Sequence, residues 1–150
     1  MIHEVASGKG AICASILATL PGWFGMPESN EAYRHDVEAM PMFVACVAGE
    51  DIGFIALKQH TKFASEIHVL GVRPEWHRKG IGRALVARAC GFCIADANRF
   101  LTVKTRSPSR PDAGYLKTLA FYEALGFMAI EEFPLLWNPE NPALMMIKVL

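Results

Sequence analysis

The sequence lacks the features of an exported or membrane-spanning chain. The first ten residues, MIHEVASGKG, have no apolar core behind a basic end, so they do not resemble a signal peptide. No stretch of about 18 apolar residues without charge occurs, so no membrane-spanning helix is expected. We therefore predict a cytoplasmic protein that does not associate with a membrane.

The sequence also has no excess of charge of either sign. Lys and Arg number 15, and Asp and Glu also number 15, in a chain of 150 residues. A general nucleic-acid or membrane-surface binder carries a basic excess, so both classes of protein are disfavoured. A chain of this length suits one domain, and we predict a single domain over residues 1–150.

Cysteine is scarce, and its four positions do not form a site. They are Cys13, Cys46, Cys90 and Cys93. The last two form a C-x-x-C, but they fall inside a predicted helix, whereas a redox pair usually lies at a helix start. No further ligand stands at zinc-binding spacing, so we predict reduced thiols that pack in the core, and no metal.

The apolar periodicity predicts alternating helices and strands. Helices are expected over 10–20, from a cap at Ser29 or Asn30 to about 39, over 83–97 and over 115–125. Strands are expected over 42–48, 51–60, 65–72, 99–105, 127–133 and 143–149, with a polar loop over 107–114. This order indicates an α/β or α+β sheet with helices on both sides. Strict alternation in the strand 65–72 would place Glu66, His68, Leu70 and Val72 on one face.

A basic, glycine-containing loop joins one of these strands to a helix. The stretch RPEWHRKGIGRALVARA, residues 73–89, has Gly80 and Gly82 among four basic side chains, just before a helical pattern. Bare backbone beside positive charge at a helix start is typical of a phosphate site. The triphosphate loop G-x-x-x-x-G-K-[ST] and the dinucleotide loop G-x-G-x-x-G both fail to match. A simple tight turn remains the alternative.

Two segments together resemble the GNAT superfamily of acyl-CoA-dependent N-acetyltransferases. VLGVRPEWHRKGIGRALV, residues 69–86, resembles its V-x-P strand end, Q/R-x-x-G-x-G/A loop and helix. AFYEALGF, residues 120–127, resembles its second signature at the expected distance. His77 replaces the usual glutamine or arginine, and Tyr115 replaces an asparagine that often precedes the signature tyrosine.

The resemblance implies a fold and a co-substrate. The expected fold is a mixed, mostly antiparallel sheet of six to seven strands, splayed where the pantetheine arm of coenzyme A pairs like an extra strand. The expected co-substrate is acetyl-CoA, bound mainly by backbone N–H groups. The residues implied in its binding are Leu70, Gly71, Val72, His77, Arg78, Lys79, Gly80, Ile81, Gly82, Arg83 and Tyr122.

Acetyl transfer to an amine poses two proton problems: the amine must lose a proton, and the departing thiolate must gain one. The resemblance makes Tyr122 the candidate acid, with a packing tyrosine as the alternative. Glu66 resembles the base of the histone acetyltransferase branch, although a surface glutamate is the plain reading. His68 is a second candidate base, a water-holding residue or a structural histidine. A backbone N–H near Leu70 is the implied oxyanion donor.

The acceptor is expected between the loop that joins the first two helices and the connection of the last two strands. Candidate residues there are Trp23, Phe24, Glu28 and Trp137. Aromatic faces and carboxylates suit a cationic amine, although Trp23 and Phe24 would equally cover the core. We predict direct transfer to a small-molecule primary amine in a ternary complex. The alternatives are a protein or peptide acceptor and a non-catalytic acyl-CoA-binding module, and a homodimer is possible.

Overall fold

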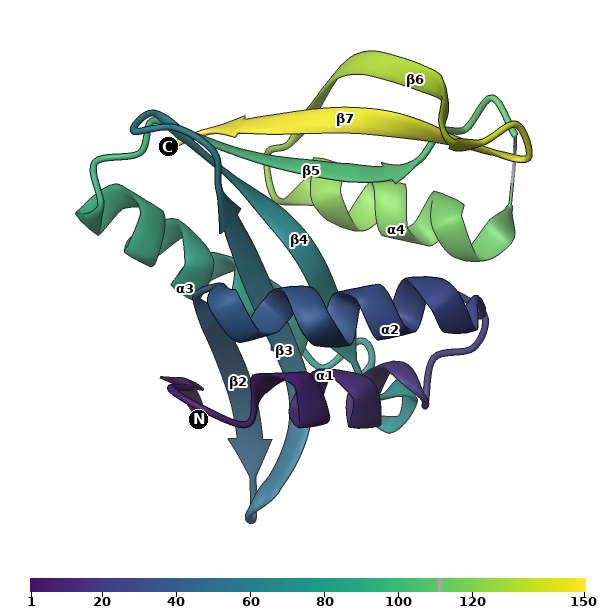
Figure 1. The fold of residues 1–150 in the computed structure, drawn as a ribbon. Helices are drawn as coiled ribbons and strands as arrows, with labels where there is room; N and C mark the ends of the chain where they lie inside the picture. The colour runs from purple at the N-terminus through teal and green to yellow at the C-terminus, as the bar shows by residue number, and fades with distance from the viewer. Residues whose placement is uncertain (111) are drawn as a thin grey trace.

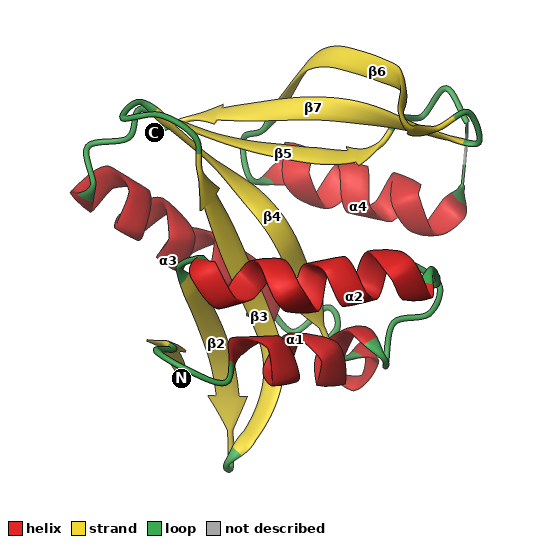
Figure 2. Ribbon diagram, in the orientation of Figure 1, coloured by secondary structure: helices red, strands yellow, loops and turns green. Residues whose placement is uncertain are grey.

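A seven-stranded sheet organises the chain, which we describe from a computed structural model over residues 1–110 and 112–150. The strand order is β1-β2-β3-β4-β5-β7-β6 (Figures 1 and 2). The strands are β1 (Ile2–Glu4), β2 (Met42–Val47), β3 (Glu50–Gln59), β4 (Ala64–Val72), β5 (Phe100–Arg106), β6 (Met128–Asn138) and β7 (Asn141–Val149). The helices are α1 (Lys9–Leu17), α2 (Pro27–Asp36), α3 (Ile81–Ala95) and α4 (Ala113–Ala124), with 3-10 turns η1 (Val37–Ala39) and η2 (Pro74–Trp76).

The sheet is splayed between its two central strands. Every neighbouring pair is antiparallel except β4 and β5, which run parallel. These two strands pair only over Ala64–Ile67 and Phe100–Val103, and they then diverge (Figure 1). Their carboxyl-terminal halves therefore do not pair with each other. The predicted mixed, mostly antiparallel and splayed sheet is confirmed.

Helices cover both faces of the sheet, as predicted. On one face, α1 and the end of α2 enclose a core that includes Ile16, Leu17 and Phe54. On the other face, α3 and α4 enclose a larger core that includes Leu85 and Tyr122. Two apolar layers therefore hold the sheet, one on each side.

A β-bulge interrupts β4 near its middle. Ala56 of β3 pairs with Val69, and the next residue, Leu57, pairs with Ile67. His68 is therefore the extra residue on β4. A bulge shifts the inward and outward alternation of a strand by one position, so residues before and after it exchange faces.

The predicted common face for four β4 side chains is wrong because of this bulge. Leu70 and Val72 pack against the α3–α4 core. His68 instead contacts Asp36 at the end of α2, on the opposite face. Ile67, just before the bulge, points into the α3–α4 core. Its neighbour Glu66 therefore points to the opposite face, which is also the face of His68.

Two strands depart from the sequence prediction. The short strand β1 was not predicted, because three residues carry no periodic signal and it is fixed by pairing with β2. Strand β6 continues through Pro134 to Asn138, where a proline-rich connection was expected. It lies at the edge of the sheet, where a missing backbone donor is tolerated. Trp137 is therefore a strand residue.

The helix boundaries also differ at their ends. Helix α1 ends at Leu17, three residues early, and 3-10-like turns continue to Leu20. Helix α2 begins at Pro27, so the expected caps at Ser29 and Asn30 are wrong. Proline is favoured in the first helical turn because the N–H that it lacks would have no partner there. The predicted loop 107–114 includes Pro111, which lies outside the described residues.

Two of the four cysteines, Cys13 and Cys93, are core residues, whereas Cys46 and Cys90 are only partly buried. All four are free, and Cys93 is fully buried. Burial raises the pKa of the Cys93 thiol to about 11, which keeps it protonated and unreactive. Over the described residues, no group of three or more His, Cys, Asp or Glu side chains is placed to hold a metal ion. Within the same residues, no helix combines the length and apolarity that crossing a membrane requires.

Candidate active site

The loop between β4 and α3 presents free backbone donors. Gly80 caps α3 with a φ of 80°, and among the described residues no side chain hydrogen-bonds to the first turn of the helix. Arg78 also has a positive φ, of 60°, which is uncommon for a residue with a side chain. Left-handed residues in such a loop turn successive N–H groups toward one point, and the helix dipole adds attraction for an anion.

The second glycine of the loop has a different role from the first. A Cβ added at Gly82 would lie 3.1 Å from a ring carbon of Phe121, on α4. A Cβ added at Gly80 would meet nothing within 4 Å, so that glycine is required by its φ alone. Gly82 therefore allows α3 and α4 to approach each other at the wall of the site.

His77 ties the loop to the strand that precedes it. Its Nε2–H donates to the carbonyl oxygen of Val72, at 2.6 Å. The ring also packs edge-on against Trp23, with the ring centres 5.8 Å apart. This histidine, which departs from the usual family residue, therefore positions both the loop and the α1–α2 connection.

A cavity of about 1180 Å³ extends from this loop through the splay of the sheet. It is walled by β4, β5, α4, the α1–α2 loop and the β6–β7 hairpin. The predicted site residues on its wall are Trp23, Phe24, His68, Leu70, Gly71, Val72, His77, Arg78, Gly80, Ile81, Gly82, Arg83, Tyr122 and Trp137. Glu28, Glu66 and Lys79 do not line it. The structure thus brings most of the predicted residues together in one space.

Tyr122 lies at the wall of this cavity on α4. The residue is only 5% exposed, and its ring packs against Phe121 and Phe127, with ring centres 5.1 and 5.4 Å away. Burial raises the pKa of its hydroxyl well above the ordinary value, so the group stays protonated. The hydroxyl of this cavity-lining residue therefore carries a proton that it can donate, while the same burial makes it a weaker acid than a free tyrosine.

Glu66 has both carboxylate oxygens occupied. Oε1 accepts from His60 Nε2 at 2.6 Å, and Oε2 accepts from Lys104 Nζ at 2.9 Å. Burial alone would raise the pKa of this carboxyl, but the hydrogen bonds from Lys104 and His60 outweigh it and lower the pKa. A carboxylate that is paired, buried and absent from the cavity wall is a poor proton acceptor for a substrate.

His68 is the ionisable β4 side chain that reaches the cavity. Its Nε2–H donates to Asp36 Oδ2, at 3.1 Å. Its ring packs edge-on against Tyr33, with ring centres 5.4 Å apart. When Asp36 holds the proton on Nε2, the lone pair of the imidazole is on Nδ1. The bulge turns this histidine toward α2, and no sequence pattern indicated either that turn or the role of Asp36.

Aromatic side chains form another part of the cavity wall. Trp23 and Phe24 come from the α1–α2 connection, and Trp137 comes from β6. The hydroxyl of Tyr115, at the start of α4, donates to the carbonyl oxygen of Trp23 at 2.9 Å. Glu28 is exposed on α2 and lies away from the cavity. The site therefore has the predicted aromatic residues without the predicted carboxylate.

Sequence reasoning missed several polar residues of this wall, among them Asn30, Arg106 and Asp112. Asp112 is the N-cap of α4, and its carboxylate accepts from the N–H groups of Gly114 and Tyr115. An acidic residue just before a helical pattern is a recognisable cap signal, so this residue could have been found. The other two are brought to the cavity only by the tertiary fold.

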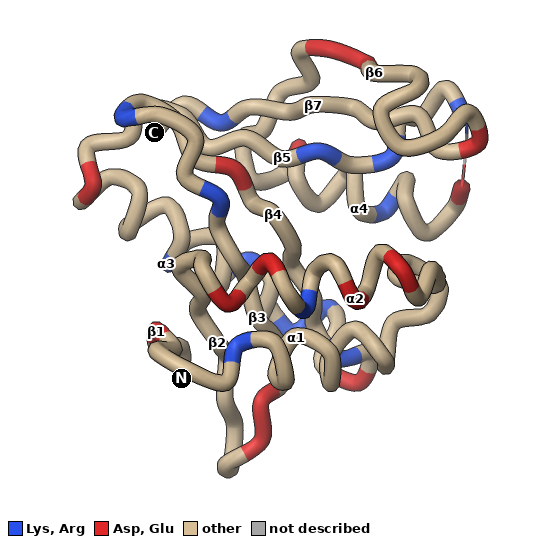
Figure 3. Tube along the Cα trace, in the orientation of Figure 1, with Lys and Arg blue, Asp and Glu red and all other residues tan. Residues whose placement is uncertain are grey.

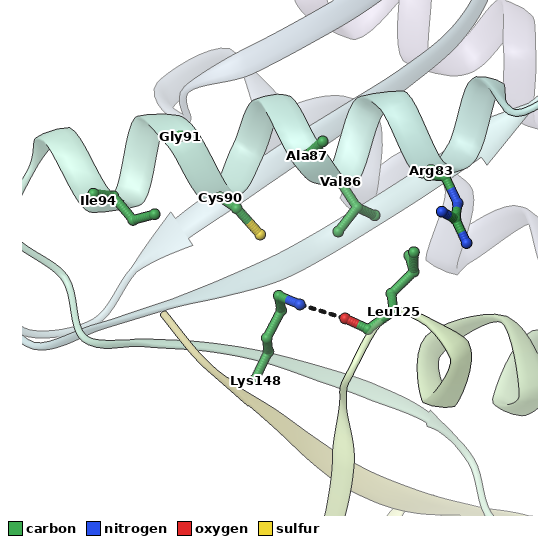
Figure 4. A pocket seen from close by; sticks show the side chains of 8 residues that line it. All are labelled: Arg83, Val86, Ala87, Cys90, Gly91, Ile94, Leu125 and Lys148. Atoms are coloured by element: carbon green, nitrogen blue, oxygen red, sulfur yellow. Dashed lines mark hydrogen bonds between the residues drawn. The ribbon is translucent and has the colours of Figure 1, made fainter.

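A second cavity of about 540 Å³ shares two lining residues with the first, and Figure 4 shows the side chains that line it. Its wall is mostly the apolar outer side of α3, closed by Leu125 and Lys148. The Lys148 ammonium donates to the carbonyl oxygen of Leu125 (Figure 4). The two cavities share Arg83 and Leu125, but none of the predicted catalytic residues lines the smaller one.

Comparison with known proteins bears on this site. A family model described as an acetyltransferase (GNAT) domain matches residues 38–129. A GNAT-family acetyltransferase from Desulfovibrio desulfuricans is 16% identical, covers 99% of this chain and 98% of its own, and superposes with a TM-score of 0.86. An aminoglycoside 6'-N-acetyltransferase from Enterococcus faecium is 19% identical, with coverages of 99% and 96% and a TM-score of 0.77.

A third similar structure carries the co-substrate. It is a GNAT-family acetyltransferase from Elizabethkingia anophelis with acetyl-CoA bound, 17% identical, with coverages of 100% and 97% and a TM-score of 0.78. Among curated proteins, no sequence matches the chain.

The matched family model spans more than half of the chain, which therefore belongs to the GNAT acetyltransferase family. The predicted enzyme class, an N-acetyltransferase that uses acetyl-CoA, is confirmed by this membership. The residues present fit that co-substrate, because a helix start capped by a glycine without a side chain, a loop with left-handed residues and a cavity at the sheet splay lie together. The single domain, the cytoplasmic location and a homodimer stay predictions.

Proposed function

We propose that the protein transfers the acetyl group of acetyl-CoA directly to a primary amine of a small molecule, within a ternary complex. The observation that supports it most is that one cavity is lined by the loop between β4 and α3 (the α3 loop), by Tyr122 and His68, and by the aromatic residues Trp23, Phe24 and Trp137. One continuous space can hold the co-substrate and the acceptor together, so no covalent enzyme intermediate is needed.

The co-substrate would bind at the splayed side of the cavity. The N–H groups at the start of α3 and the side chains of Arg78 and Arg83 would hold its pyrophosphate. The unpaired edge of β4 beyond Ile67 would pair with its pantetheine arm. When bound, acetyl-CoA supplies an acetyl group activated as a thioester.

Two side chains of the chain would move the protons of the reaction. His68 accepts a proton from the acceptor amine at Nδ1, while Asp36 holds Nε2 and stabilises the resulting imidazolium. Tyr122 donates its hydroxyl proton to the sulfur that leaves. Glu66, proposed from the sequence as the base, is better placed to hold Lys104 and His60.

A small acceptor is favoured by the shape of the remaining space. The α1–α2 loop and the β6–β7 hairpin both contribute to the wall of the cavity, as Trp23 and Trp137 illustrate. A walled cavity with aromatic sides is typical of small-molecule sites. The structurally similar aminoglycoside 6'-N-acetyltransferase also takes a small acceptor, as its name states.

The proposal is tested by measuring free coenzyme A released from acetyl-CoA in the presence of candidate acceptors. The panel contains small amines, amino acids, aminoglycosides and peptides with free amino termini. We expect release with particular small amines and slower or no release with peptides. Preferential release with peptides would replace the small-molecule assignment with a peptide one. Tight acetyl-CoA binding with no release by any acceptor would refute the transferase function.

A further inference from the structure

The charged wall of the large cavity is mostly cationic. Five Lys or Arg side chains and one carboxylate line it: Arg78, Arg83, Lys104, Arg106, Lys117 and Asp112. The carboxylate is already engaged as the cap of α4. The wall formed by the described residues therefore offers little to attract an acceptor that is only cationic.

Arg106 is the cation of this wall that most needs a ligand. Arg78 and Arg83 flank the loop assigned to pyrophosphate, and Lys104 is paired with Glu66 at 2.9 Å. Arg106 is half-buried, and in the described part of the chain it forms no ion pair or side-chain hydrogen bond. Its Nε is fully buried without a partner among those residues. A buried N–H without an acceptor is unfavourable, and a bound anion would satisfy it.

The position of Arg106 separates it from the pyrophosphate loop. On β5, Leu101 and Val103 point into the α3–α4 core. Alternation then turns Lys104 and Arg106, the two cationic positions of β5 in Figure 3, to the opposite face. His68 is turned to that face of the sheet as well. The guanidinium itself also reaches α4, because its carbon is 5.7 Å from the ring centre of Tyr115, and both residues line the cavity.

A second polar atom on the wall lacks a hydrogen-bond partner among the described residues, and it is an acceptor rather than a donor. Asn30 donates from Nδ2 to the carbonyl oxygen of Phe24 at 2.7 Å, which fixes the amide group. Its Oδ1 is buried and has no hydrogen-bond partner among the described residues. A fixed oxygen without a donor is suited to accept from an N–H of a ligand. The wall therefore offers both an anion site and an N–H acceptor.

We propose that the acceptor is an amine that also bears a carboxylate, as a free amino acid does. Arg106 pairs with the carboxylate, and Asn30 accepts a hydrogen bond from an N–H of the same molecule. This inference rests on the proposed transfer to a small amine and names the class of its acceptor. It replaces the acceptor with only cationic charge that was expected from the sequence, because Glu28, the carboxylate expected near the aromatic residues, does not line the cavity.

The first test compares acceptors that differ only in the anion. Each of the common L-amino acids is assayed beside its C-terminal amide, with kanamycin as a polycationic acceptor, and free coenzyme A is measured. We expect at least one amino acid to have a kcat/KM roughly 10- to 100-fold above that of its amide, the range of a charge-assisted hydrogen bond. Equal or better turnover of the amides or of kanamycin would overturn the inference and leave the small-amine transferase standing.

The second test removes the guanidinium. In Arg106→Gln, we expect kcat/KM for the preferred amino acid to fall roughly 10- to 100-fold, with kcat/KM for its amide changed by less than about threefold. The KM for acetyl-CoA should stay unchanged. The matched control is Arg99→Gln, an exposed arginine next to the other end of β5, which does not line the cavity and should leave both acceptors unaffected.

The outcomes show whether Arg106 binds a carboxylate of the acceptor or a phosphate of coenzyme A. A raised KM for acetyl-CoA in Arg106→Gln, with the preference for amino acid over amide retained, would assign the arginine to a phosphate of coenzyme A and overturn the inference. Equal losses for the amino acid and its amide would make the arginine merely structural. No coenzyme A release with any acceptor, despite acetyl-CoA binding, would overturn the proposed function together with this inference.

Discussion

At the scale of single residues, Tyr122 has a ring that serves packing and a hydroxyl that is the candidate proton donor. The ring is packed between Phe121 and Phe127, and burial raises the pKa of the hydroxyl. Tyr122→Phe keeps this packing and removes only the proton donor. We expect kcat to fall on the order of 10²-fold, the low end for a positioned acid, because thiolate is already a fair leaving group. The KM for acetyl-CoA should change little.

Steady-state kinetics with an identified acceptor measure this effect, and calorimetry with acetyl-CoA shows whether binding is retained. Full activity in Tyr122→Phe would remove the acid role. A raised KM with an unchanged kcat would instead make Tyr122 a residue that positions the co-substrate.

We expect His68 to control the rate of transfer and Glu66 to control stability. If His68 takes the proton of the amine, His68→Gln should lower kcat/KM on the order of 10²-fold near neutral pH. The deficit should shrink as the pH rises, because more acceptor is already neutral. The pH–rate profile of the variant measures this, with Glu66→Gln as the comparison. The same profile for His68→Gln and the wild type would exclude the histidine as the base.

Glu66 should control stability instead. Because the folded protein lowers the pKa of this carboxyl below its ordinary value of 4.5, ionised Glu66 stabilises the fold above that pH. The contribution is lost as the pH falls through the lower, folded-state pKa. We expect Glu66→Gln to lower the free energy of unfolding by about 1–3 kcal/mol at pH 7.

Denaturant unfolding between pH 7 and pH 3 measures that difference. The gap between the wild type and Glu66→Gln should narrow toward the acid end. A gap that widens as the pH falls would show that the sign of the pKa shift is wrong.

At the scale of elements, helices α3 and α4 approach each other at Gly82, on the wall of the site. A Cβ at Gly82 would already approach the Phe121 ring to 3.1 Å. Gly82→Val should therefore separate the two helices, lower stability by about 1–3 kcal/mol and weaken acetyl-CoA binding at least about tenfold. Thermal unfolding and calorimetry measure the two effects.

Gly91 supplies the matched control for that substitution. It lies on the same helix, and an added Cβ there would meet nothing within 4 Å. Gly91→Ala should raise stability by about 0.5–1 kcal/mol, because alanine has a higher helix propensity, and should leave acetyl-CoA affinity unchanged. If Gly82→Val retained wild-type stability and affinity, the close approach of α3 and α4 would have no role in the site.

The elements that could be predicted from the sequence are those with a local cause. The loop and helix of residues 73–95 have glycines, charges and periodicity in one stretch. Helix α4 ends at Ala124, two residues before Gly126, whose φ of 94° is typical of a glycine just past a helix end. The bulge at His68 could not be predicted, because it is a mismatch between two strands rather than a pattern in one. Strand β1 and the extension of β6 likewise depend on neighbours distant in the sequence.

The candidate site divides in the same way. Tyr122 and the α3 loop lie on the cavity wall as predicted, because signature motifs carry them. Asn30 and Arg106 come from a helix and a strand that meet only through the fold, so nothing in the sequence connects them. Their unsatisfied atoms become visible only when burial and partners are known.

At the scale of the whole molecule, the splay between β4 and β5 makes one cavity out of two half-sites. We propose that acetyl-CoA occupies the part beside α3 and that the acceptor occupies the part beside α2, β5 and β6. His68 and Tyr122 both line this cavity. The central claim is that both substrates occupy this cavity at the same time.

Initial-rate kinetics test that claim most directly. Free coenzyme A is measured while acetyl-CoA is varied at several fixed concentrations of an acceptor identified in the amine panel. Simultaneous occupancy predicts double-reciprocal lines that intersect. Parallel lines, the sign of an acetyl-enzyme formed before the acceptor binds, would contradict direct transfer.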